Sequence, residues 1–394
     1  MKGNNMGRAL KALAVSMAVG LGMTACSRDY TVGYLYVTNA KATPGLITAY
    51  AIDYQSGALI PLSDSPIASG GNNPVTVVAA PNGLFLYVIN QGTSTVVEFA
   101  INSDGTITSK NTYNVLAGNA TASPTSAAID PAGKFLYVTS QHQTGTTGPG
   151  ALSTFPINTD GSLGTALSVI ALGDNPAGIT IPATGGFVYV VDQESPLTSS
   201  AHGVLLAYTQ NTTTGVLTPV TGSYFNGVAA GTTPSAIAED PSGHFIYVTD
   251  EATNQLYGYT VSNGGAPLAM LNSPFVTGLY PVSVKVDPRG TFVYVANFAS
   301  STVGAYVINT ATGALSGASG GASTATGPTC VTIDPALGIY LYTSNNTDNS
   351  VSAEQLNPHS GALTQVQGTQ FSSQAQPTCL VAVANGAHAT QIVE

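Results

Sequence analysis

The sequence predicts an all-β fold, a seven-bladed β-propeller built from four-stranded antiparallel blades. Three observations lead to this prediction. A six-residue strand motif recurs seven times, three further strand-like segments accompany each copy, and the two chain ends supply complementary parts of one repeat. Repeats of roughly 40–50 residues with four short strands each are typical of propeller blades. A single domain over residues 31–394 accounts for the whole pattern.

The recurring motif consists of an aromatic residue, an aliphatic residue, a tyrosine and, at its end, a short polar residue. Its copies are YLYVTN (34–39), FLYVIN (85–90), FLYVTS (135–140), FVYVVD (187–192), FIYVTD (245–250), FVYVAN (292–297) and YLYTSN (340–345). Runs of aromatic and β-branched residues favour strands over helices. We therefore expect seven equivalent strands, one in each blade.

Each motif copy is accompanied by three more segments. A strand that opens with proline and ends in a turn precedes it, as in SPTSAAIDPAG (123–133). An apolar strand follows it, as in STVVEFAIN (94–102), and a short fourth strand comes after a glycine. These glycines are Gly57, Gly105, Gly161, Gly215, Gly265, Gly313 and Gly361. Helical periodicity is missing beyond the N-terminal segment, so four short strands per repeat are expected.

The chain ends predict how the ring closes. The repeat region begins with a second strand, GYLYVTN, and finishes with a first strand, QPTCLVAVANG (376–386). The last blade should therefore take its innermost strand from the C-terminal end and its other strands from the N-terminal end. Such pairing leaves no exposed sheet edge between the two ends.

The first 25 residues predict a lipoprotein signal peptide. Lys2, Arg8 and Lys11 form a basic start, and the apolar stretch after them is too short to span a membrane as a stable helix. The stretch runs into MTAC, which resembles a bacterial lipobox, so Cys26 is expected to be lipidated, with residues 26–30 as a linker. An ordinary cleaved signal is the alternative. A serine after the cysteine suggests the outer membrane of the bacterial cell envelope, reached through the lipid anchor only.

The charge balance excludes some partners. Without the three basic residues of the signal, 6 of the 9 Lys and Arg remain against 19 Asp and Glu, so the net charge falls from −10 to −13. Nucleic acids need a basic surface, so they are excluded as partners, and direct attraction to anionic lipid is disfavoured. We expect a monomer.

The motif copies, together with the Asp-Pro-x-Gly turns at 130–133, 240–243 and 287–290, resemble the YVTN-type seven-bladed propellers of the 6-phosphogluconolactonase-like (lactonase) family. The resemblance covers residues 31–386. It implies the propeller fold and hydrolysis of a sugar lactone as an activity. The repeated residues are the structural ones, and fold alone does not settle function.

Candidate chemistry lies where the repeat is broken. The loops between the second and third strands of three successive copies are unusual in length or charge: 140–151, 192–203 and 250–255. A histidine beside carboxylates can carry out general acid–base catalysis near neutral pH, and the same oxygen atoms could hold Ca²⁺. The third possibility is solvated loops without a site. The candidate residues are His142, Asp192, Glu194, His202, Asp250 and Glu251.

Other repeated polar residues are expected to be structural. Asp130, Asp240, Asp287 and Asp334 recur in turns, where aspartate accepts backbone hydrogen bonds. The polar residue that ends each motif is expected to cap a turn. Those residues are Asn39, Asn90, Ser140, Asp192, Asp250, Asn297 and Asn345.

Two cysteines occupy the same position in neighbouring repeats. Cys330 and Cys379 each stand two residues after a strand-opening proline, where every repeat has a small residue. Outside the cytoplasm a disulfide between them is allowed, and two free buried thiols are the alternative.

Two functions fit these observations. The first is a binding or scaffold module for a glycan or protein partner in the envelope, without a required cofactor. The alternative is a hydrolase of an unphosphorylated sugar lactone, with His142 or Glu194 as the base. A phosphorylated substrate would need Arg or Lys at the site, and few basic residues are available.

Overall fold

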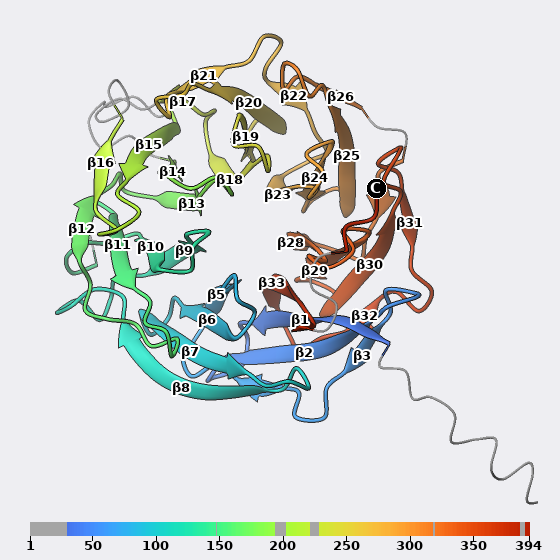
Figure 1. Cartoon of the computed structure of the whole chain (residues 1–394), viewed down its shortest axis with the longest axis horizontal. Coiled ribbons are helices and arrows are strands. Elements are labelled where there is room, and N and C mark those ends of the chain that lie inside the picture. Colours follow the sequence, from blue (N-terminus) through green and yellow to red (C-terminus); the bar gives the residue numbers. More distant parts are fainter. Residues whose placement is uncertain (1–29, 147, 194–201, 221–227, 318–319, 387–390) are drawn as a thin grey trace, which may run out of the picture.

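The computed structural model describes residues 30–146, 148–193, 202–220, 228–317, 320–386 and 391–394. Seven antiparallel sheets surround one axis, and each contributes its first strand to the centre (Figure 1). This confirms the predicted seven-bladed propeller. The predicted signal peptide, Cys26 and almost all of the linker lie outside the described residues. No helix in the described ranges is long and apolar enough to cross a membrane.

The first three blades follow the chain from the axis outward. Blade 1 contains β5 (Pro74–Ala79), β6 (Phe85–Asn90), β7 (Thr95–Ile101) and β8 (Ile107–Asn114). Blade 2 contains β9 (Pro124–Ile129), β10 (Phe135–Ser140), β11 (Ala151–Pro156) and β12 (Ser168–Ala171). Blade 3 contains β13 (Pro176–Thr180), β14 (Phe187–Asp192), β15 (Val204–Gln210), β16 (Leu217–Pro219) and β17 (Val228–Ala229).

The next three blades have the same plan, with an outer strand in two pieces. Blade 4 contains β18 (Pro234–Glu239), β19 (Phe245–Asp250), β20 (Gln255–Val261), β21 (Pro267–Ala269) and β22 (Phe275–Val276). Blade 5 contains β23 (Pro281–Val286), β24 (Phe292–Asn297), β25 (Thr302–Ile308), β26 (Leu315–Gly317) and β27 (Ala322–Ser323). Blade 6 contains β28 (Pro328–Ile333), β29 (Tyr340–Asn345), β30 (Ser350–Leu356), β31 (Leu363–Gln365) and β32 (Phe371–Ser372).

Blade 7 joins the two ends of the chain, as predicted. It contains β33 (Pro377–Ala384), β1 (Thr31–Asn39), β2 (Leu46–Asp53), β3 (Leu59–Pro61) and β4 (Ile67–Ala68). β33 pairs antiparallel with β1, with Leu35 opposite Ala382. The C-terminal strand therefore becomes the innermost strand of a sheet whose remaining strands come from the N-terminal end (Figure 1).

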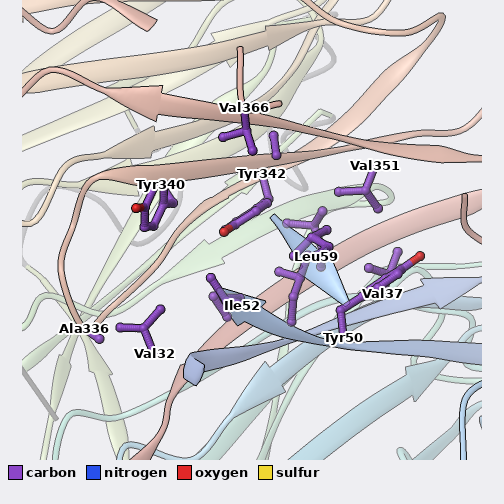
Figure 2. Close-up of a cluster of buried hydrophobic side chains, with 14 of the residues drawn as sticks. Val32, Val37, Tyr50, Ile52, Leu59, Ala336, Tyr340, Tyr342, Val351 and Val366 are labelled. Atoms are coloured by element: carbon purple, nitrogen blue, oxygen red, sulfur yellow. The ribbon is translucent and has the colours of Figure 1, made fainter. Parts of the chain in front are cut away.

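Apolar side chains fill the spaces between neighbouring blades. The cluster between blades 6 and 7 contains Val37, Tyr50 and Ile52 from one blade and Tyr340 and Tyr342 from the other (Figure 2). All are nearly or fully buried. Packing of this kind stabilises by roughly 25 cal/mol per Å² of apolar surface removed from water. The closing blade is thus held by a core as well as by strand pairing.

A ring of tyrosine hydroxyls explains the recurring motif. The tyrosine at the third position of each motif is fully buried and donates a hydrogen bond to the carbonyl oxygen of the repeated glycine in the following blade. The pairs are Tyr36–Gly105 (2.7 Å), Tyr87–Gly161 (2.7 Å), Tyr137–Gly215 (3.3 Å), Tyr189–Gly265 (3.0 Å), Tyr247–Gly313 (2.8 Å), Tyr294–Gly361 (3.0 Å) and Tyr342–Gly57 (2.9 Å). Since the last pair joins blade 6 to blade 7, these hydrogen bonds run around the whole ring.

The first aromatic residue of each motif packs against the same glycine. At Gly161 the backbone has φ +85°, and a Cβ atom there would lie 2.3 Å from the Phe85 ring. Gly105 and Tyr34 have the same relationship. The position therefore needs glycine for its backbone conformation and for the close approach of the ring. The motif and the glycine are two halves of one contact between blades.

The turn aspartates accept backbone hydrogen bonds, as predicted. The Asp130 carboxylate accepts from the amides of Lys134 and Phe135, both at 2.6 Å. Asp287 accepts from Phe292 at 2.7 Å and also pairs with Arg289 at 2.8 Å. These turns form one face of the ring, which we call the turn face.

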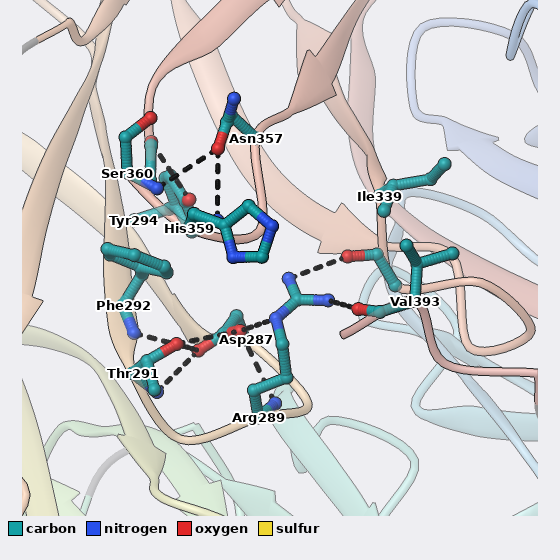
Figure 3. A network of polar contacts seen from close by, with 12 residues as sticks. Asp287, Arg289, Thr291, Phe292, Tyr294, Ile339, Asn357, His359, Ser360 and Val393 are labelled. Carbon is teal, nitrogen blue, oxygen red and sulfur yellow. Dashed lines mark hydrogen bonds and ion pairs between the residues drawn. The ribbon is translucent and has the colours of Figure 1, made fainter.

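The C-terminal tail lies against the turn face. Arg289 donates hydrogen bonds to the carbonyl oxygens of Gly338 and Val393, each at 2.9 Å (Figure 3). The Gln391 amide donates to Ala336 at 2.6 Å, and the Val393 amide donates to Leu337 at 2.9 Å. The tail is therefore tied to a turn of blade 6.

Candidate functional site

The opposite face carries the loops between second and third strands and the links between blades, and we call it the mouth face. Two of its predicted catalytic carboxylates cap turns. Asp250, at the end of β19, is buried and accepts from the amides of Thr232 (2.6 Å), Thr233 (3.1 Å) and Ala252 (3.0 Å). Asp192, at the end of β14, is also buried and accepts from the Asn175 amide at 3.3 Å. Both therefore order the links that enter the inner strands.

The two predicted histidines lie apart. His142 is half-buried in a hollow of about 280 Å³ that Gln91, Thr121 and Ser123 also line. No carboxylate lines this hollow in the described part of the chain. His202 is exposed just before β15. Glu194 lies outside the described residues, so its position relative to these histidines stays a prediction.

Glu251 is the predicted residue whose backbone pairs with the link that enters an inner strand. Its backbone amide donates to the Thr233 carbonyl at 3.1 Å, just before the first proline of β18. Blade 3 lies between Glu251 in blade 4 and His142 in blade 2. The structure therefore does not bring these two groups together as an acid–base pair.

The same backbone contact recurs around the axis and defines a mouth ring. In each blade, the residue after the motif donates its amide to the residue before the inner-strand proline. The pairs are Ala40–Gln376 (2.9 Å), Gln91–Asn73 (2.9 Å), Gln141–Ser123 (3.0 Å), Gln193–Asn175 (3.0 Å), Glu251–Thr233 (3.1 Å), Phe298–Tyr280 (2.8 Å) and Asn346–Gly327 (2.8 Å). The ring stands directly above the inner strands because its members adjoin their first residues.

One side of the mouth ring is a chain of hydrogen-bonded amides. Ser123 donates to Gln141 at 2.7 Å, and the Gln141 amide donates to Asn175 at 3.0 Å. Asn175 in turn donates to Gln193. Asn73 and Gln91 form a similar pair at 2.9 Å. These side chains carry no charge and offer both donors and acceptors, as hydroxyl-rich ligands require.

The other side of the ring joins a carboxylate to two aromatic residues. Burial raises the pKa of Glu251 above its ordinary value, and the charge of Asp250 adds to the rise, whereas a hydrogen bond with Tyr280 lowers it. The charge of Glu251 and burial in turn raise the pKa of Tyr280. The Tyr280 and Phe298 rings lie 6.0 Å apart. This sector thus holds a proton acceptor in a partly desolvated position beside apolar ring surfaces.

Below the mouth ring, the inner strands enclose an axial channel of about 470 Å³. Hydroxyls at its upper end bind the next blade. Thr125 donates to the Pro176 carbonyl at 2.6 Å, Ser235 to Pro281 at 2.7 Å, and Thr378 to Pro74 at 2.7 Å. The mouth ring therefore opens into a volume within the range of roughly 300–1,000 Å³ that is usual for small-molecule sites.

Sequence comparison identifies the family. The sequence profile described as lactonase, seven-bladed β-propeller, matches residues 34–224 and 203–333, which together cover most of the chain.

The chain belongs to the lactonase family of seven-bladed β-propellers.

Solved structures share the seven-bladed fold. The periplasmic gluconolactonase of Pseudomonas aeruginosa is 17% identical, with a TM-score of 0.73 over 90% of this chain and 99% of that chain. A proposed 6-phosphogluconolactonase of Bacteroides uniformis is also 17% identical, with a TM-score of 0.73 over 90% of this chain and 100% of that chain. At this identity the likeness shows the fold alone. No curated protein matches the sequence.

The mouth face of this lactonase-family chain is poor in cations. Lys41 is an exposed cation in a loop of this face. Arg289 and Lys134 lie in turns of the opposite face, and Lys110 lies in the outer strand β8. Across the described ranges, no three His, Cys, Asp or Glu side chains gather as a metal site. The Ca²⁺ alternative therefore has no supporting cluster there.

The structure joins Cys330 and Cys379 by a disulfide, with their Cα atoms 4.9 Å apart. Both residues line the channel, in blades 6 and 7. The bond therefore links the C-terminal strand to its neighbour on the side away from blade 1.

Sequence reasoning found Glu251 and missed the rest of the mouth ring. The residue after each motif is Gln, Gln, Gln, Glu, Phe or Asn in six of the seven copies, so polar and aromatic side chains recur there. Apart from the acid at Glu251, the side chains at this position are neutral and lie at the same place in each repeat, so no break in the repeat marks them.

Proposed function

We propose that this lactonase-family protein hydrolyses an uncharged sugar lactone at the mouth ring, with Glu251 as the general base. The observation that supports this most is the position of Glu251. It is a half-buried carboxylate with a raised pKa, beside Tyr280 and next to a chain of neutral amides. The family assignment supports lactone hydrolysis over the binding-module alternative.

The reaction needs one general base and hydrogen-bond donors for the oxyanion. Glu251 accepts a proton from a water molecule as its oxygen attacks the lactone carbonyl carbon. The resulting oxyanion is stabilised by hydrogen-bond donors, for which Tyr280 and the amides of the mouth ring are available. When the bond between the carbonyl carbon and the ring oxygen breaks, Glu251 returns the proton to the leaving alkoxide, and the open-chain acid is released.

The small number of Lys and Arg side chains on the mouth face supports an unphosphorylated substrate. A phosphate group is normally bound by Arg, Lys or several backbone amides. On the mouth face, Lys41 belongs to blade 7, whereas Glu251 belongs to blade 4. We therefore expect gluconolactone to be preferred over 6-phosphogluconolactone.

Lactone hydrolysis is tested with the purified mature protein. We expect acid release from gluconolactone above the spontaneous rate, and Glu251→Gln should lower kcat by about 100-fold or more, the usual contribution of a general base. Because the pKa of Glu251 is raised, the catalysed rate should rise with pH to a midpoint above that of an ordinary glutamate. Glu98→Gln, a buried carboxylate in β7, serves as a matched control. A wild-type rate equal to that of buffer would reject the proposal.

The residues predicted from the loops are tested in the same assay. His142→Ala, His202→Ala, Asp192→Asn and Glu194→Gln should leave kcat within a few-fold of wild type if Glu251 is the base. Loss of turnover in Glu194→Gln with unchanged Glu251→Gln would move the site to the long loop of blade 3.

Glycan binding is a second candidate, because the mouth ring combines amides with the Tyr280–Phe298 pair. Amide groups and aromatic faces suit the hydroxyls and C–H surfaces of sugars. A protein that binds envelope glycans but releases no acid from any lactone would support this role instead.

We propose that Cys26 anchors the protein in the cell envelope through its lipid. The lipobox-like MTAC and the basic start support this. In cells grown with labelled palmitate, the wild-type chain should take up label, and Cys26→Ser should not. Label in the variant would contradict the anchor.

A further inference from the structure

The end of the axial channel away from the mouth ring contains a charged pair that the proposed reaction does not use. Glu239 in β18 and Lys285 in β23 line the channel from neighbouring blades. They are the charged residues among the described side chains that line it. The same two residues also line a second cavity of about 310 Å³. They therefore stand at the junction of the two volumes.

The second cavity opens toward the turn face. Pro241, Pro288 and Pro335, from the turns of blades 4, 5 and 6, line it together with the charged pair. A ligand can thus reach Glu239 and Lys285 from the turn face without passing the mouth ring. Both volumes, about 310 and 470 Å³, fit small organic molecules.

The wall around the pair has a polar and an apolar side. Thr180 of blade 3 donates a hydrogen bond to the Glu239 carboxylate. On the other side of Lys285, Thr332 of blade 6 also lines the channel. Across the channel, blades 7, 1 and 2 present apolar side chains near the same level. Those residues are Val381, Val78 and Ala128.

The electrostatics favour a bound anion. Lys285 is exposed to the channel, and its ammonium group has three donors. Protein surrounds the Glu239 carboxyl group, although part of the residue faces the channel. Burial raises the pKa of Glu239 to about 7, while the Lys285 charge lowers it. A protonated Glu239 leaves Lys285 as an uncompensated cation in a low-polarity enclosure, where an anion interacts more strongly than in water.

We propose that this end of the channel is a binding site for a small hydroxycarboxylic acid, with the ligand carboxylate on Lys285 and a ligand hydroxyl on Glu239. Thr180 and Thr332 supply further hydroxyl contacts on the same wall. The site is separate from Glu251, so it stands whether or not the mouth ring hydrolyses a lactone.

Affinity for such an acid should depend on pH. The groups facing Glu239 are Thr180 from β13, Tyr189 from β14, Lys285 from β23 and the adjacent Asp240. As pH rises through about 7, Glu239 ionises, neutralises Lys285 and repels the ligand carboxylate. Binding of the acid should therefore weaken from pH 6 to pH 8.

Calorimetric titration of the mature protein with gluconate, and with sorbitol as the uncharged counterpart, tests the proposal. We expect gluconate to bind at pH 6 and sorbitol to bind at least tenfold more weakly, because a charge-assisted hydrogen bond is lost. Lys285→Met should lower gluconate affinity by tenfold or more. Lys134→Met removes the same charge from the same face and should leave the affinity unchanged.

A second variant separates folding from binding. Glu239→Gln keeps the side-chain shape and should bind gluconate equally well at pH 6 and pH 8. Thermal melting of each variant verifies folding before titration. The proposal is overturned if gluconate gives no heat at millimolar concentrations, if folded Lys285→Met binds as wild type, or if sorbitol binds as tightly as gluconate. Glu251→Gln should bind gluconate normally, so failure of lactone hydrolysis is distinguishable from failure of this site.

Discussion

Single buried carboxyl groups set part of the pH response of this protein. Glu354 in β30 is fully buried, and both of its carboxyl oxygens are without a hydrogen-bond partner among the described residues. Burial raises its pKa to about 8 from the ordinary value of 4.5. In the folded state the neutral form is therefore favoured, while the unfolded chain ionises near the ordinary value.

Because the pKa of Glu354 is raised in the folded state, we expect the free energy of unfolding to fall as pH rises. Its contribution to the free energy of unfolding is complete below pH 4.5, falls as pH rises above that value, and levels off above about 8. Glu354→Gln should stabilise the fold at pH 9 by about 1–3 kcal/mol and have little effect at pH 5. Denaturant unfolding at both pH values measures the difference. A stabilisation of the same size at pH 5 and pH 9 would show that ionisation is not the cause.

At the scale of elements, contacts between blades depend on the motif tyrosines and the turn glycines. Gly161→Ala should destabilise the fold for two reasons, a positive φ and a Cβ atom 2.3 Å from the Phe85 ring. Gly118→Ala is the matched control, because its φ is +81° and nothing lies within 4 Å of its Cβ position. The control should cost about 1 kcal/mol and Gly161→Ala about 1–3 kcal/mol more. Equal melting temperatures for the two variants would contradict this explanation.

The strands of this protein could be predicted from the sequence more fully than the residues of its candidate site. The seven strands of YLYVTN type were predictable because aromatic and β-branched residues repeat with a fixed spacing, and the closing pair β1–β33 followed from the two partial repeats. The hydrogen bond of Tyr87 could not be predicted, because its partner Gly161 lies in the next repeat and only the fold brings the two together. Glu251 was predictable as an unrepeated acid, whereas Gln141 and Asn175 meet through the ring geometry.

At the scale of the whole molecule, closure depends on the C-terminal strand. β33 is held by pairing with β1, by the Thr378 hydroxyl on Pro74, and by the disulfide to Cys330. The disulfide closes a segment of 49 residues, for which chain entropy predicts roughly 3–4 kcal/mol. Adding a reductant, or replacing Cys379 by serine, should lower the melting temperature without opening the ring. Labelling by a thiol reagent in the unreduced, unfolded protein would instead show free cysteines.

The position of the N-terminal end decides how the molecule would be oriented by the proposed lipid anchor. β1 begins on the turn face, where the Tyr54 amide of a turn donates to the Tyr30 carbonyl at 2.6 Å. Only residues 27–30 separate Cys26 from Thr31, the first residue of β1, and the five Cα–Cα steps between the two reach at most about 18 Å. With the lipid on Cys26 that we propose, the turn face lies toward the bilayer and the mouth ring points away from it. Large ligands would then approach Glu251 freely from the aqueous side, while the Lys285 end would receive only what diffuses between the protein and the headgroups.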